Sequence, residues 1–250
     1  MAISKTAEKN HEELFPNHKS VLKEKDPELV EIFDNFAFDE VMQYGDMDVK
    51  TRLRLILASL IAQQSLNEYK VMMKGAMNVG VTPIEIKEIV YQAVPYCGMA
   101  KVFDFLHAIN DILEEYGIPL PLEGQSTTTT ETRLDKGLEV QKSIFGETID
   151  RMYEEAPKDQ IHIQQYLSDN CFGDFYTRTG LSIKERELIT FVILISLGGC
   201  EPQVKGHIQG NFNVGNDKQT LLTTITQLIP FLGYPRTLNA IRCINEVTFE

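Results

Sequence analysis

Cysteine and closely spaced histidine are scarce in this sequence. Its four cysteines, Cys97, Cys171, Cys200 and Cys243, show no C-x-x-C spacing, which argues against a disulfide framework or a zinc site. The five histidines show neither H-x-H nor H-E-x-x-H spacing, so no metal centre is predicted. We expect a reducing, cytoplasmic environment, with most of these cysteines acting as small buried apolar side chains.

Positive charge and long apolar runs are also scarce. The net charge is −12, which argues against nucleic acid or an anionic membrane surface as the main partner. The most apolar segment, residues 188–197, is about half as long as the ~20 residues that cross a bilayer. The N-terminal sequence has no apolar stretch typical of a signal peptide. We expect a small-molecule substrate, and an acidic one requires a locally basic pocket.

A predicted helical hairpin at residues 182–215 organises the chain. Ser182 and Glu185 form a capping box that starts the first helix. An apolar run then ends at Gly198-Gly199, and a more polar segment follows it. This pattern predicts a buried helix joined by a tight turn to an antiparallel amphipathic helix.

Three chemically active side chains are expected at this hairpin. At about 1.5 Å rise per residue, Glu187 and His207 lie within roughly one turn of the same level. Cys200 begins the second helix, where free backbone N–H groups lower a thiol pKa. The sequence therefore predicts a carboxylate, an imidazole and a thiol in one cluster. The alternatives are a Glu187 that only favours the helix dipole, a structural His207, and a Cys200 that is merely small.

The order of elements repeats along the chain. Residues 91–112 match residues 226–247, with Pro95 aligned to Pro230 and Gly98 to Gly233. Pro95 is expected to break its helix. We predict an all-α tandem duplication with no strand. Its parts are a first copy at 1–116, a linker at 117–132 that is rich in proline, glycine, serine and threonine, and a second copy at 133–250.

The two copies differ at the candidate site. His207 aligns with Met72 of the first copy, Cys200 with Ser65, and Glu187 with Leu53. We therefore expect the second copy to carry the chemistry through His207, Cys200 and Glu187, and the first copy to supply packing.

The segments SDNCFGDFYTRTGLSIKERELITFVILISLG and IPFLGYPRTLNAI resemble the carboxymuconolactone decarboxylase family, which has an alkylhydroperoxidase-like fold. The resemblance covers nearly all of residues 135–248 and, more weakly, residues 20–115. It is strongest to the γ-carboxymuconolactone decarboxylase branch. The resemblance implies helical units that assemble as hexamers, so a two-unit chain is expected to form a homotrimer with a pseudo-hexameric arrangement.

The resemblance also implies an activity. In this branch carbon dioxide is lost from a lactone carboxylate without a metal or an organic cofactor. His207, tuned by Glu187, is then the expected acid that protonates the product carbon. Arg178 or Arg186 is the expected cation that holds the substrate carboxylate.

Two other functions remain open at this point. The related alkylhydroperoxidase branch carries an E…C-x-x-C-x-x-x-H pattern, in which Cys200 and His207 match the first cysteine and the histidine. Gln203 stands at the position of the second cysteine, so a thiol-dependent peroxidase using Cys200 lacks its resolving thiol. The third alternative is a non-catalytic helical oligomer that binds a small ligand.

Overall fold

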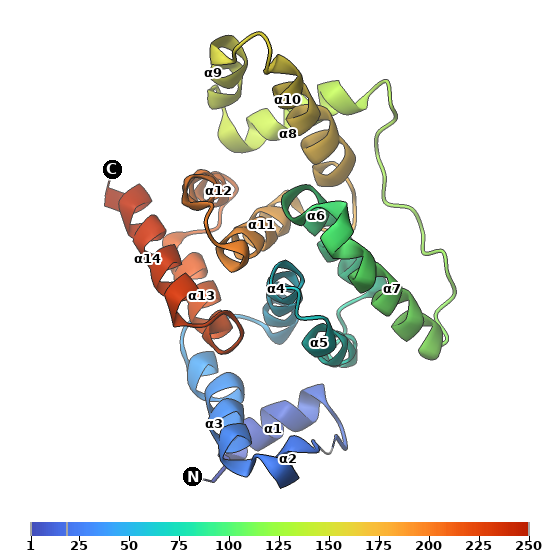
Figure 1. Cartoon of the computed structure of the whole chain (residues 1–250), viewed down its shortest axis with the longest axis vertical. Helices are drawn as coiled ribbons and strands as arrows, with labels where there is room; N and C mark the ends of the chain where they lie inside the picture. Colours follow the sequence, from blue (N-terminus) through green and yellow to red (C-terminus); the bar gives the residue numbers. More distant parts are fainter. Residues whose placement is uncertain (1, 19, 250) are drawn as a thin grey trace.

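The computed structural model describes residues 2–18 and 20–249, and within these ranges all regular structure is helical (Figure 1). No strand occurs in that part of the chain, which confirms the all-α prediction. No helix there is long and apolar enough to cross a membrane.

The two copies contain the same four helices in the same order. In the first copy they are α4 (Val49–Ala62), α5 (Leu66–Asn78), α6 (Pro83–Cys97) and α7 (Met99–Glu115). In the second copy they are α11 (Ile183–Leu197), α12 (Glu201–Asn213), α13 (Lys218–Leu232) and α14 (Tyr234–Phe249). The predicted tandem duplication is therefore confirmed.

Short helices precede the hairpin of each copy and lie at opposite ends of the molecule (Figure 1). Before the first hairpin these are α1 (Lys5–Leu14), α2 (Leu22–Lys25), α3 (Pro27–Phe38) and the 3₁₀ segment η1 (Glu40–Gln43). Before the second hairpin they are α8 (Arg133–Phe145), α9 (Thr148–Glu155), α10 (Ile161–Tyr166) and the π-helical segment η2 (Leu167–Tyr176).

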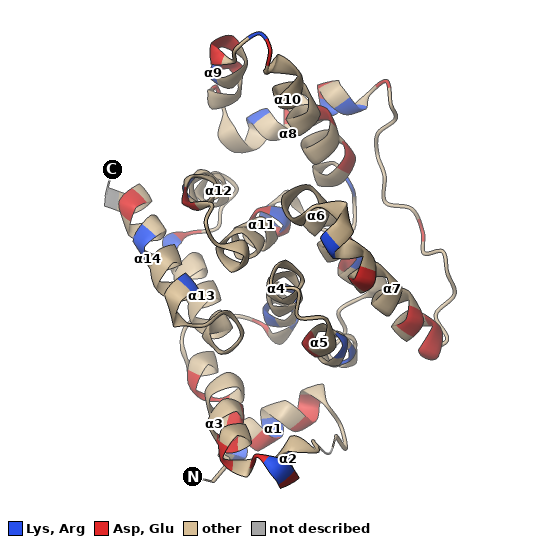
Figure 2. Ribbon diagram, in the orientation of Figure 1, with Lys and Arg blue, Asp and Glu red and all other residues tan. Residues whose placement is uncertain are grey.

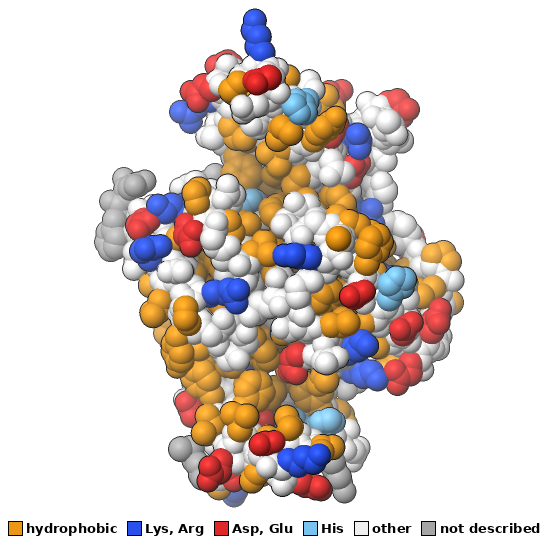
Figure 3. All heavy atoms as spheres, in the orientation of Figure 1, with side chains coloured by type: hydrophobic (Ala, Val, Ile, Leu, Met, Phe, Trp, Pro, Cys, Tyr) orange, Lys and Arg blue, Asp and Glu red, His pale blue; other side chains and the backbone are white. Residues whose placement is uncertain are grey.

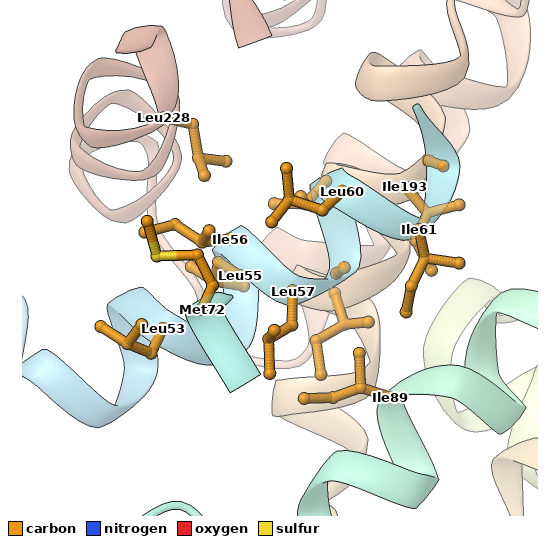
Figure 4. Packing of buried hydrophobic residues seen from close by; sticks show 14 of the residues in the cluster. Leu53, Leu55, Ile56, Leu57, Leu60, Ile61, Met72, Ile89, Ile193 and Leu228 are labelled. Carbon is orange, nitrogen blue, oxygen red and sulfur yellow. The ribbon is translucent and has the colours of Figure 1, made fainter. Parts of the chain in front are cut away.

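The hairpin helices α4 and α11 form the centre of the core and pack on each other. Each also contacts a helix of the other copy, since α6 packs on α11 and α13 packs on α4. Figure 4 shows Leu57 and Ile61 of α4 near Ile89 of α6 and Ile193 of α11. Burying each such side chain stabilises the fold by roughly 1.5–3 kcal/mol. The two copies therefore share one core.

Helices α8 and η2 approach each other closely at two glycines. A Cβ atom at Gly137 would lie 1.9 Å from the carbonyl oxygen of Ser168. A Cβ atom at Gly173 would lie 2.1 Å from the carbonyl oxygen of Arg133. Only glycine fits at these positions, and this contact fixes the end of η2 from which Tyr176 extends.

Local signals in the sequence set most helix ends. The capping box of Ser182 and Glu185 is present, as is that of Thr82 and Glu85. The prediction that Pro95 breaks its helix is wrong, because α6 continues through it to Cys97. Proline removes one backbone N–H donor, but it does not prevent the residues that follow it from keeping helical dihedral angles, and the helix ends at Gly98. Between α7 and α8 no helix forms.

Charged and apolar side chains are unevenly placed. Figure 2 shows acidic and basic residues together on α11, in the middle of the molecule. Among these, Arg186 and Glu187 are fully buried. Figure 3 shows apolar side chains on the side of the molecule formed by α13 and α14, where Tyr234 and Leu238 are exposed.

Candidate active site

Glu187 of α11 and His207 of α12 are in direct contact. Nδ1 of His207 lies 2.9 Å from Oε2 of Glu187. The Glu187 side chain is fully buried, whereas that of His207 is 13% exposed. The proximity expected from the hairpin is therefore present, and it joins a buried carboxylate to an imidazole near the surface.

Aromatic rings enclose the imidazole of His207. Tyr96 of α6 and Phe145 of α8 contact it edge-on, with ring centroids 5.8 and 5.5 Å away. Since Nδ1 is bonded to Glu187, Nε2 is the nitrogen left for a substrate, and it has no hydrogen-bond partner among the described residues. A carboxylate that orients one ring nitrogen and leaves the other free is a common arrangement for acid–base catalysis.

The second oxygen of Glu187 is bonded to Tyr176, at the end of η2. The Tyr176 hydroxyl donates to Oε1 over 2.8 Å. The same hydroxyl lies 2.7 Å from Oγ1 of Thr190 and 3.0 Å from the hydroxyl of Tyr96. Glu187 is therefore held by a buried hydroxyl on one side and an imidazole on the other.

Burial raises the pKa of Tyr96 and of Tyr176 well above the usual range, and the nearby charge of Glu187 adds to this effect. The hydroxyls therefore keep their protons at any working pH. Burial also raises the pKa of the Cys171 thiol, which contacts Tyr96, to about 12. These groups act as hydrogen-bond donors and remain uncharged beside the carboxylate.

Helix α12 approaches Glu187 through a glycine. A Cβ atom at Gly210 would lie 2.5 Å from Oε2 of Glu187 and 2.9 Å from a ring carbon of Phe145. One residue further, the amide of Asn211 donates to the carbonyl oxygen of Glu187 over 3.0 Å. The absence of a side chain at 210 leaves the space in which the carboxylate meets His207.

A hydrogen-bonded chain extends from this pair along α6. Gln92 donates to Thr190 over 3.0 Å and accepts from Arg186 over 3.0 Å. Arg186 in turn donates to Oε2 of Glu88 over 2.8 Å. The first copy thus contributes three side chains to this network, Glu88, Gln92 and Tyr96, so the expectation that it supplies packing alone is wrong.

Arg186 and Arg178, the two arginines expected to bind a carboxylate, differ in how far they are exposed. Arg186 is 0% exposed and donates to Glu88 and Gln92, so it positions these two side chains. Burial lowers its pKa, and Glu88 partly offsets this effect. Arg178 is 17% exposed, binds Glu88 with two nitrogens and lies 4.9 Å from the ring centre of Tyr91.

Cys200 lies apart from the Glu187–His207 pair. Its Sγ is 3.3 Å from the carbonyl oxygen of Leu194, and it lines a small hollow that Cys243 also lines. Along α12 it is about 10 Å from His207. The expected lowering of its pKa is wrong, since burial raises this pKa and Glu201 raises it further. Cys171 and Cys243 are buried, and Cys97 is only partly so.

Several side chains of this site were not predicted from the sequence. Tyr96 aligns with Phe231 and Glu88 with Thr223 in the repeat. In each pair one copy has a polar or charged group that the other copy lacks, as in the pair of His207 and Met72. Tyr176 gives no such signal, because its position depends on the π-helical turn of η2.

In the described residues no group of three or more His, Cys, Asp or Glu side chains is arranged to hold a metal ion.

Comparison with known proteins gives two matches to one family model, that of the carboxymuconolactone decarboxylase family, at residues 27–111 and 162–246.

Two curated relatives are similar to parts of the chain. The 4-carboxymuconolactone decarboxylase of Acinetobacter baylyi is 30% identical over 118 residues, which are 47% of this chain and 87% of that protein. A nitrosuccinic acid decarboxylase of Metarhizium robertsii is 33% identical over 89 residues, which are 34% of this chain and 62% of that protein.

Proposed function

Because the chain belongs to the carboxymuconolactone decarboxylase family, we propose that it is a decarboxylase whose proton-transfer site is centred on His207. The observation that carries the proposal is the contact of His207 with the buried Glu187, which leaves Nε2 without a hydrogen-bond partner among the described residues. The reaction needs no metal or organic cofactor.

The proposed substrate is a small carboxylated lactone or a related acid. In each of the two compounds named for the relatives, the electron pair left by departing carbon dioxide can delocalise into a neighbouring group. That group is a lactone carbonyl in one compound and a nitro group in the other. Such delocalisation lowers the barrier to losing carbon dioxide. We therefore assign a substrate with this electronic arrangement.

In the proposed reaction the bond between the carboxylate and the adjacent carbon breaks, and its electron pair stays on that carbon and its electron-accepting group. Carbon dioxide leaves. Protonated His207 then gives its Nε2 proton to carbon, and solvent restores that proton. Glu187 stabilises the imidazolium form, and the surrounding rings of Tyr96 and Phe145 keep water from the carbanion.

The test is turnover of 4-carboxymuconolactone and, separately, of 2-nitrosuccinate, followed by release of carbon dioxide. In D₂O one deuterium should enter the product at carbon. His207→Asn should lower kcat by about 100-fold or more, since general acid catalysis contributes 10²–10⁴. His162→Asn, which changes an exposed histidine on α10, is the matched control and should keep full activity.

A His207→Asn variant that folds and retains wild-type turnover would remove His207 from the reaction. Absence of turnover of both compounds by folded wild-type protein would instead remove the substrate assignment.

A further inference from the structure

A cavity lies away from His207, between α6, α7 and the linker. Its volume is about 400 Å³, within the range typical of small-molecule sites. Its lining includes Lys87 and Tyr91 of α6, Asn110 of α7, Arg178, and linker residues 120–125. The decarboxylation proposed above makes no use of this space.

The linker forms a fixed wall of this cavity. Thr179 donates its backbone N–H to the carbonyl oxygen of Gln125 over 3.0 Å. Further along, the hydroxyl of Thr127 donates to the carbonyl oxygen of Thr177 over 2.9 Å. The cavity is therefore formed by ordered backbone on the linker side and by helices on the other.

The charge around this cavity is positive, in contrast to the chain as a whole. The carboxylate of Glu88 is bonded by both Arg178 and Arg186, so this group of three keeps one positive charge. Lys87 adds another, with its Nζ bonded to the neutral amide of Asn110. The acidic residue of the lining besides Glu88 is Glu123, which is exposed.

Arg178 and Lys87 each keep the capacity to bind a negatively charged ligand. Nη1 of Arg178 has no hydrogen-bond partner in the described part of the chain, since Nε and Nη2 hold Glu88. Burial lowers the pKa of Lys87, as expected for a half-buried amine that lacks a neighbouring anion. An incoming carboxylate would meet one donor from each side chain.

The rest of the lining is apolar or aromatic. Ile84, Leu120 and Leu122 line the cavity together with the ring of Tyr91. A ligand that fits this surface carries a short apolar body as well as its negative charge.

This cavity is separate from the His207 site. Glu88 of α6 lies beside Arg178, and Tyr96, near the C-terminal end of the same helix, lies beside His207. Their separation along the helix axis is about 12 Å. A small ligand held by Arg178 therefore does not reach Nε2 of His207.

We propose that the cavity lined by Lys87, Arg178 and the linker is a second ligand site, which binds a small organic carboxylate with a short apolar chain. The proposal does not depend on the proposed decarboxylation. Its occupant binds Arg178 beside Glu88, so binding here also acts on one end of the hydrogen-bonded chain that leads to Glu187.

Titration calorimetry with three six-carbon probes tests the site: adipate, hexanoate and hexylammonium. Adipate and hexanoate should bind the full chain, and hexylammonium should not. Lys87→Gln keeps a group able to bond Asn110 but removes the charge, and it should weaken adipate binding by about tenfold or more, the effect of one charge-assisted hydrogen bond. Arg178→Gln should do the same, because Arg186 still holds Glu88.

Two controls locate the binding. Lys74→Gln makes the same charge change on α5, where Lys74 pairs with Glu115, and should leave adipate affinity unchanged. His207→Asn should leave it unchanged as well. No adipate binding by wild-type protein would overturn the proposal, as would binding that His207→Asn abolishes and Lys87→Gln does not affect.

Discussion

The hydroxyl of Tyr176 donates to Oε1 of Glu187 over 2.8 Å, opposite the oxygen that His207 contacts. A buried carboxylate with a donor on each oxygen stays fixed in direction, so the imidazole it orients is fixed too. This relationship links the close packing of η2 on α8 to the position of a ring nitrogen on α12.

Tyr176→Phe removes that donor while keeping the ring. We expect a loss of about 1.5–3 kcal/mol in the free energy of unfolding, the usual value for a hydrogen bond to a charged group, together with lower kcat. Thermal denaturation and turnover measure the two effects.

Tyr69→Phe is the matched control for this substitution. Tyr69 is also fully buried, but its hydroxyl has no partner among the described residues. Removing an unsatisfied group should raise stability by about 1 kcal/mol and leave kcat unchanged. Equal destabilisation by the two substitutions would contradict the role assigned to the Tyr176 hydroxyl.

Gly210→Ala should displace the carboxylate of Glu187, because the added Cβ would lie 2.5 Å from Oε2. We expect turnover to fall by about 100-fold, as for other small misplacements of catalytic groups, and stability to fall with it. Gly206→Ala, one turn earlier on α12, meets no atom within 4 Å. It should raise stability by about 0.5–1 kcal/mol through helix propensity alone. Similar behaviour of both variants would argue against a steric role for position 210.

Thr223→Glu should stabilise the protein. Arg52, which aligns with Arg186 in the repeat, is buried with Nε and Nη1 unpaired among the described residues, and burial lowers the pKa of Arg52 to about 10. In the other copy Arg186 pairs with Glu88, the residue that aligns with Thr223.

A restored ion pair should raise the free energy of unfolding by about 1 kcal/mol or more, since an uncompensated buried charge costs several kcal/mol. Thr223→Gln has the same size without the charge and serves as the control. If the glutamine variant is as stable as the glutamate variant, a negative charge at position 223 does not stabilise Arg52.

Cys200 should react slowly with iodoacetamide at neutral pH. Because its pKa is raised, its thiolate fraction at pH 7.5 is smaller than that of a free cysteine with a pKa of about 8.5. Its alkylation rate, followed by mass spectrometry of the peptide, should therefore still be increasing with pH above about pH 8.5, where the rate of a free cysteine begins to level off. A rate that levels off below pH 8 would revive the thiol-peroxidase alternative.

Much of the fold follows from local patterns in the sequence. Capping boxes, helical periodicity and the repeated order of elements are properties of neighbouring residues, and the structure confirms them. The contact of Glu187 with His207 also follows, since helix rise and a tight turn fix the level of each residue.

The rest of the site depends on packing between distant helices. Tyr96 reaches His207 only because α6 packs on the hairpin of the other copy, which no local pattern specifies. Likewise, the sequence shows two arginines near the hairpin but not that Arg186 is buried and Arg178 borders a cavity. The trimeric assembly and cytoplasmic location stay predictions.

The crossing of α6 onto α11 has a consequence for how the protein responds to dilution. The helix that supplies Tyr96 is tethered to the helix that supplies Glu187 by one continuous chain, so their effective concentration is set by the tether and not by the amount of protein present. The pairing of the two halves at this site therefore persists in a single molecule, and each half is free to differ from the other in sequence.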